Sequence, residues 1–247
     1  MRLTACTFVM TLTFFAATAQ AATITVFSDI NIWRDSPLLA GNAQLGLNML
    51  GSSTNVLMSS QTGPVNDADA LAALYAAQGG VAFSRSGAAL TGGLLAGLDL
   101  LVLDIAFDTL SPYDASERSA IAAFLAGGGD VALIAESINQ SIIDSFNTLL
   151  AEIGSSISYE GPDRAALGSQ LADTILNVPL TSGVASFEVA AINNLLGGTP
   201  AIQDEDFTAV AFEETSLVPE PSTLALFGIG MAALVAWRRQ KTYRELS

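Results

Sequence analysis

The chain of 247 residues contains no histidine, and its single cysteine, Cys6, lies near the start. Without an imidazole, neither a Ser-His-Asp triad nor a histidine-ligated metal site can form. Lys241 is the only lysine, so a Ser-Lys pair is excluded from the body of the chain. Oxygen ligands remain, and these suit Ca²⁺ or Mg²⁺. We expect no metal site built on nitrogen or sulfur.

Positive charge is also scarce. Residues 22–216 hold 22 Asp and Glu, because only Glu220 and Glu245 of the chain's 24 lie outside this range, against four Arg, which leaves a net charge of −18. Nucleic acids and anionic lipids both need a positive surface, so we expect neither as a partner. Two interpretations fit the acidity, namely solubility outside the cell and binding of a divalent cation.

The first 21 residues have the pattern of a secretory signal peptide. Arg2 is followed by an apolar run over residues 3–17 and by the small residues Ala19 and Ala21. This order predicts export, with cleavage after Ala21. Because cleavage removes Cys6, the mature chain has no thiol and can form no disulfide.

The chain ends with a short apolar segment. The 14 residues from Leu224 to Trp237 would span roughly 21 Å as a helix, less than the ~30 Å of a bilayer core. A buried core helix is the alternative, but this segment is apolar on every side. We therefore predict a membrane helix at about 222–237 and a basic cytoplasmic tail at 238–247 that begins with Arg238 and Arg239, so that everything before it lies outside.

Pro219, Glu220 and Pro221 precede this segment. Together with the apolar helix and Arg238-Arg239, they resemble the PEP-CTERM sorting signal of Gram-negative bacteria, so residues 217–247 would be a sorting segment. The resemblance implies recognition by exosortase, a membrane-embedded cysteine protease and transpeptidase, in bacteria that build exopolysaccharide or biofilm matrix. It implies transient anchoring in the inner membrane, processing near the Pro-Glu-Pro motif, and transfer to the cell surface or the medium.

Residues 22–216 alternate apolar runs with helical patterns, which predicts one exported α/β domain with a mostly parallel sheet and helices on both faces. The predicted strands are 24–27, 55–58, 98–104, 131–135 and 156–159, and the predicted helices are 37–50, 67–78, 114–126 and 138–153. After Asp173, short runs at 185–192, 199–202 and 207–213 predict a β-rich C-terminal portion that extends or covers the sheet.

Two stretches of this domain, "DLLVLDIAFDTLSPYDASERSAIAAFLAGGGDVALIAES" (99–137) and "VPLTSGVASFEVAAINNLLGGTPAI" (178–202), resemble class I glutamine-amidotransferase-like domains. The resemblance implies a flavodoxin-like sheet. In active members the turn after the strand at 131–135 carries a nucleophilic Cys, but here it reads Ala135-Glu136-Ser137. Ser137 has no His to act as its base, so we expect no catalytic triad. No G-x-G-x-x-G follows the first strand either, so we expect no cofactor.

In an open parallel sheet, ligands bind at the carboxyl ends of the strands. A ligand crevice there would be acidic and rich in hydroxyl and amide groups, which suits a sugar or a cation. Its candidate residues are Asp29, Asn31, Arg34, Asp104, Asp108, Glu136, Ser137 and Asn139. The alternative is that Asp29 and Asp104 only cap loops and the helices that follow.

Two classes of function follow from these patterns. The first, which we favour, is a non-catalytic binding or structural protein of the envelope or extracellular matrix, with exopolysaccharide or a divalent cation as its partner. The second is a secreted enzyme that acts on glycans with carboxylates alone, and Asp104 with Glu136 would be its acid–base pair.

Overall fold

The computed structural model describes residues 21–34, 38–60, 68–107, 109–110, 112–163, 169–215 and 230. Ala21–Leu217 form one compact unit. Both hydrophobic clusters and the whole sheet lie inside it, so it carries its own core and can fold by itself. The predicted signal peptide, apart from Ala21, and the predicted membrane segment, apart from Gly230, lie outside the described residues. None of the helices described is long and apolar enough to cross a membrane.

Eight of the described strands form one sheet, in the order β3-β2-β4-β5-β1-β12-β11-β8. The first five are parallel to one another, and the last three run antiparallel to their neighbours. The bounds are β1 Thr23–Phe27, β2 Asn55–Ser59, β3 Ala82–Ser86, β4 Leu100–Asp104, β5 Asp130–Ile134, β8 Thr174–Ile175, β11 Thr199–Asp204 and β12 Phe207–Glu214. The predicted mostly parallel sheet and its β-rich extension are confirmed.

Position in the sheet explains which strands the sequence revealed. β4 is buried over its whole length, as expected of a parallel strand covered on both faces, and its apolar run predicts it. β3 pairs with β2 alone and lies at the edge, and every residue of its sequence AFSRS is exposed or half-buried. Because an edge strand needs no continuous apolar run, β3 was not predicted.

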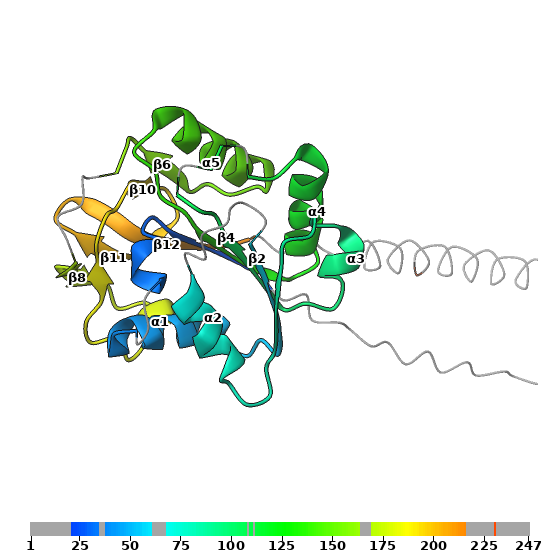
Figure 1. Cartoon of the computed structure of the whole chain (residues 1–247), viewed down its shortest axis with the longest axis horizontal. Coiled ribbons are helices and arrows are strands. Elements are labelled where there is room, and N and C mark those ends of the chain that lie inside the picture. The colour runs from blue at the N-terminus through cyan, green and yellow to red at the C-terminus, as the bar shows by residue number, and fades with distance from the viewer. Residues whose placement is uncertain are drawn as a thin grey trace, which may run out of the picture. The chain divides into compact units, whose positions relative to one another are not determined.

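Helices cover both faces of the sheet (Figure 1). On one face, α1 (Ala40–Leu50) and α2 (Asp69–Ala76) bury Leu45 and Tyr75 in a cluster with Met58 of β2. On the other face, α3 (Gly92–Leu95), α4 (Ala115–Ala126) and α5 (Gln140–Glu152) bury Ile121 and Phe146. The predicted two-faced arrangement is therefore confirmed.

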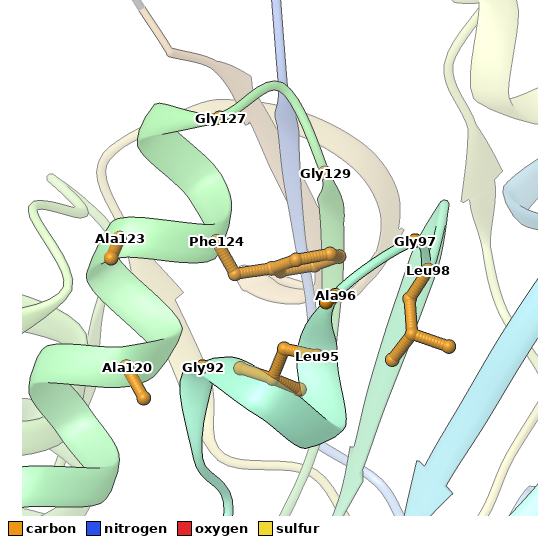
Figure 2. A pocket seen from close by; sticks show the side chains of 10 residues that line it. All are labelled: Gly92, Leu95, Ala96, Gly97, Leu98, Ala120, Ala123, Phe124, Gly127 and Gly129. Atoms are coloured by element: carbon orange, nitrogen blue, oxygen red, sulfur yellow. The ribbon is translucent and has the colours of Figure 1, made fainter.

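A small apolar pocket of about 270 Å³ lies between α3 and α4. Its lining residues are uncharged, and Figure 2 shows the Phe124 ring reaching from α4 toward Gly129. A Cβ atom on Gly129 would lie 2.2 Å from that ring, so the close approach requires glycine. Leu98 and Gly129 precede β4 and β5, which places the pocket at the amino ends of these strands, away from the predicted crevice.

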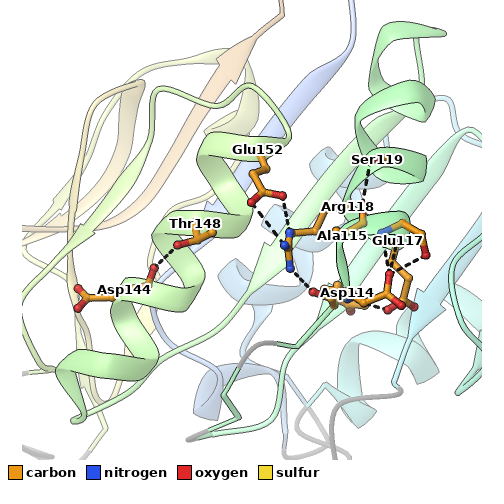
Figure 3. Close-up of polar contacts among 10 residues, drawn as sticks. Asp114, Ala115, Glu117, Arg118, Ser119, Asp144, Thr148 and Glu152 are labelled. Carbon is orange, nitrogen blue, oxygen red and sulfur yellow. Dashed lines mark hydrogen bonds and ion pairs between the residues drawn. The ribbon is translucent and has the colours of Figure 1, made fainter.

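The start of α4 is fixed by a capping box. Asp114 accepts hydrogen bonds from the backbone N–H groups of Ser116 and Glu117, while the Glu117 carboxylate accepts from the Asp114 N–H (Figure 3). Arg118 of the same helix pairs with Glu152 of α5 at 2.6 Å. The ion pair joins α4 to α5, its neighbour on the same face of the sheet.

The strand order corrects the predicted flavodoxin-like sheet. That fold has the order 2-1-3-4-5, with its first strand between the second and the third. Here β1 lies between β5 and β12, and β2 lies between β3 and β4. The five parallel strands would have the order 2-1-3-4-5 only if β2 were counted as the first strand and β1 as the last. A buried apolar strand fits any interior position of a sheet, so the residues of β1 do not reveal its neighbours.

Smaller elements complete the unit. β6 (Ser158–Glu160) pairs with β10 (Asn194–Leu196), and β7 (Gln170–Leu171) pairs with β9 (Glu188–Val189). Two 3-10 helices are η1 (Asn31–Trp33) and η2 (Pro179–Thr181). The strand predicted at 185–192 is reduced to β9, because the backbone N–H groups of Glu188 and Ala190 are bonded to the side chains of Asn42 and Asp29.

Candidate functional site

Two places at the carboxyl ends of the parallel strands are switch points, where neighbouring strands lead to helices on opposite faces of the sheet. The chain passes from β1 and β2 to α1 and α2 on one face, and from β4 and β5 to α4 and α5 on the other. β1 and its neighbour β5 therefore send their connections to opposite faces, and so do β2 and its neighbours β3 and β4. Such switch points are where ligands bind in open α/β sheets.

Asp29 lies at the first switch point, directly after β1, and its side chain is buried. One carboxylate oxygen accepts a hydrogen bond from the Asn31 N–H at 2.9 Å. The other accepts from the Ala190 N–H at 2.6 Å. Asp29 thus shapes its own loop, as the alternative interpretation held, and also joins that loop to the segment that follows β9.

Glu136 follows β5 and is buried against the same loop. Its two carboxylate oxygens accept from the Ile30 N–H at 2.9 Å and from the Asn31 side-chain amide at 2.8 Å. The structure therefore brings Asp29, Asn31 and Glu136 together, three of the residues that the sequence placed in one crevice. All four carboxylate oxygens of the two acids accept hydrogen bonds.

Burial dominates the electrostatics of this acidic pair. It raises the pKa of Glu136 from an ordinary 4.5 to about 9, and the negative charges of Asp29 and Asp163 add to the effect. Burial also raises the pKa of Asp29 from 3.8 to about 6, against the lowering effect of its N–H donors and of a hydrogen bond with Glu136. Two carboxylates in contact in a poorly solvated place resist ionising together.

Ser137 is fully buried and serves a structural role in the turn after β5. Its hydroxyl accepts the Asn139 N–H at 3.0 Å, and Asn139 in turn caps α5. Asn193, which the sequence did not single out, accepts from the Ser137 N–H and donates to the carbonyl oxygens of Ser137 and Gly161. No periodicity or motif marks Asn193, since its role depends on a contact 56 residues away in sequence.

The second switch point holds Asp104, at the end of β4. Its carboxylate is bonded at 2.9 Å to Arg85 of β3, which also pairs with Asp69 at the start of α2. Nearby, the buried Tyr113 hydroxyl donates to Ser59 of β2 at 3.2 Å, and burial raises the Tyr113 pKa. Arg85 was missed, although its charge could have marked it as one of only four arginines in residues 22–216.

The remaining predicted residues contribute less to the cluster. Arg34 is exposed after η1, and Asp108 lies outside the described residues. The two members of the proposed acid–base pair have different partners, because Asp104 is bonded to Arg85 of β3 and Glu136 to the loop after β1. Asp29, not Asp104, is the carboxyl group that meets Glu136.

Exposed apolar side chains surround this edge of the sheet. Leu39 precedes α1, Phe107 and Leu110 lie between β4 and α4, and Ile138 lies between β5 and α5, with exposures of 40 to 61%. Because the five strands are parallel, all four residues lie in connections at the carboxyl edge. We call these four residues the apolar rim.

A divalent cation finds little support in this geometry. Across the described ranges, no group of three or more acidic residues is placed to hold a metal ion. The oxygens of Asp29 and Glu136 already accept N–H donors.

Comparison with known proteins identifies the tail alone. The PEP-CTERM protein-sorting motif matches residues 217–240, which include the predicted Pro219, Glu220, Pro221, Arg238 and Arg239. No curated protein and no solved structure matches the chain. The motif supports an exosortase substrate, with export and membrane anchoring before processing. The resemblance of the exported domain to amidotransferase-like domains gains no support from these comparisons and stays a prediction.

Proposed function

We propose that this chain delivers a non-catalytic binding or structural domain to the cell surface or extracellular matrix through an exosortase-type enzyme. The observation that carries the proposal is that the two buried acids bind backbone and side-chain N–H groups of the protein itself. Asp29 and Glu136 are 1% and 3% exposed, and each of their oxygens accepts an N–H donor.

Catalysis by carboxylates requires an acid or base that reaches the substrate proton. Asp29 and Glu136 present no open oxygen, and the buried Ser137 lacks a histidine base anywhere in the chain. One oxygen of the Asp104 carboxylate is bonded to Arg85. These facts favour the scaffold over the carboxylate-dependent glycan enzyme.

The apolar rim is the proposed ligand surface. Exposed Phe107 offers an aromatic face, and Asn139 and Gln140 beside Ile138 offer exposed amides. The net charge of −18 on residues 22–216 disfavours an anionic polymer. A neutral matrix exopolysaccharide therefore fits this edge best, and the PEP-CTERM motif agrees with an origin in a bacterium that secretes such a polymer.

The test uses the compact unit Ala21–Leu217 and the purified exopolysaccharide of a producing cell. We expect saturable binding that weakens about tenfold, or 1.4 kcal/mol, when Phe107→Ser and Ile138→Ser remove the apolar rim contacts. Leu171→Ser with Leu196→Ser is the matched control, because both leucines are exposed but lie outside the rim. Equal loss in both double variants, or no binding at all, would contradict the proposed ligand surface.

The same protein should show no glutaminase, peptidase, esterase or glycan-hydrolase turnover above a Ser137→Ala control. Glycan hydrolysis that disappears in Glu136→Gln would instead establish the carboxylate-dependent enzyme.

A further inference from the structure

The Asp29–Glu136 pair has a property that the proposed binding role does not use. Each acid joins parts of the chain that are distant in sequence. Glu136 connects the end of β5 to Ile30 and Asn31, 106 and 105 residues away. Asp29 connects the same loop to Ala190, 161 residues away.

We infer that Asp29 and Glu136 share one proton near neutral pH, and that this proton forms a latch holding the ends of β1 and β5 to the segment after β9. Both side chains are buried, and both are bonded to Asn31, Asp29 to its backbone N–H and Glu136 to its side-chain amide. Two adjacent carboxylates in such a place repel each other unless one of them is protonated. With one proton, the protonated acid donates to its neighbour and the remaining oxygens keep their N–H donors.

Among the described residues, the charged neighbours of Glu136 include a further acid. From the loop after β6, Asp163 adds a negative charge near Glu136. Tyr159 of β6 is neutral, because burial and the nearby Glu136 raise its pKa, and its hydroxyl donates to the carbonyl oxygens of Phe27 and Ala135. Arg34, the basic residue nearest to Asp29 in the sequence, is exposed. A proton shared by the two acids removes the repulsion between their charges.

The direction of the pH effect follows from these pKa values. Asp29 titrates at about 6 and Glu136 at about 9 in the fold, both above their ordinary 3.8 and 4.5. The folded chain thus holds more protons than the unfolded chain between pH 4 and 9. Stability contributed by the pair is complete below pH about 4 and is lost as the pH rises through 6 and then 9. Since an exported domain meets unbuffered surroundings, alkaline conditions would loosen the carboxyl edge.

The decisive measurement is a ¹³C NMR titration of the side-chain carboxyl carbons in Ala21–Leu217, from pH 4 to 10. We expect Glu136 to stay protonated at pH 7 and to titrate near 9, and the Ala190 amide resonance to shift with the same midpoints as the pair. Ordinary midpoints below 5 for both acids would overturn the latch. So would an Ala190 resonance that ignores both titrations.

Variants test whether the shared proton matters for stability. Glu136→Gln keeps a permanent N–H donor toward Asp29 and cannot ionise, so the fall in unfolding free energy between pH 7 and 10, measured with urea, should flatten. Glu160→Gln is the matched control at an exposed position and should keep the wild-type slope. The same slope in all three proteins would contradict the proposal, and the wild-type titration decides even if Glu136→Gln does not fold.

Discussion

Pro219→Ala combined with Glu220→Ala is expected to leave a full-length chain in the inner membrane of a host that carries an exosortase. The wild-type protein in the same host should lose its C-terminal ~25 residues and appear at the surface or in the medium. The expectation comes from the tail's sequence, because proline disfavours a helical conformation in the residue before it and Glu220 supplies a charged group between two prolines. A segment of 14 apolar residues is a weak permanent anchor, because a full span takes about 20.

Mass spectrometry of the mature C-terminus measures the outcome. Ser222→Ala is the matched control, since it changes the same tail outside the Pro-Glu-Pro motif and should be processed normally. A wild-type protein that still ends at Ser247 in such a host would show that the segment is an ordinary, short anchor.

Gly41→Ala should destabilise the exported domain by about 3 kcal/mol, the upper end of the usual cost of overpacking. Gly41 lies in the first turn of α1, and a Cβ atom there would lie 1.5 Å from the carbonyl oxygen of Ser186. Backbone atoms cannot move aside as a flexible side chain does. The helix and the segment at 186–190 would separate, and the bond from the Ala190 N–H to Asp29 would weaken with them.

Chemical denaturation of Ala21–Leu217 measures this change. Gly92→Ala is the control, because Gly92 also begins a helix but a Cβ atom there meets nothing within 4 Å. Its unfolding free energy should stay within about 0.5 kcal/mol of wild type, as for most surface substitutions. Equal stability of Gly41→Ala and wild type would mean that α1 does not pack against Ser186 as described.

The secondary structure was largely predictable because the relevant signals are local. The apolar run of β4 and the helical pattern of α4 depend on neighbouring residues, so both were found from the sequence. The edge strand β3 escaped because solvent exposure removes the apolar run. The strand predicted at 185–192 shrank because its N–H groups bind side chains from distant parts of the chain.

The candidate site was predicted in composition but not in arrangement. Placing Asp29 and Glu136 at the carboxyl edge needed only the rule for parallel strands. Their direct contact required β1 to lie beside β5, and that neighbour relation contradicts the expected flavodoxin-like order. Asp104, at the end of β4 on the other side of β5, is bonded to Arg85 of β3.

The sequence by itself determined that histidine chemistry is absent and that the tail carries a sorting motif. Both follow from residue types and from a short linear signal. Tertiary structure alone decided which acids meet and that they are buried. Burial and proximity belong to the folded packing, since Asp29, Glu136 and Ala190 come together only when three separate segments close on one another. The pKa of an acid follows from that closure, and no linear pattern encodes it.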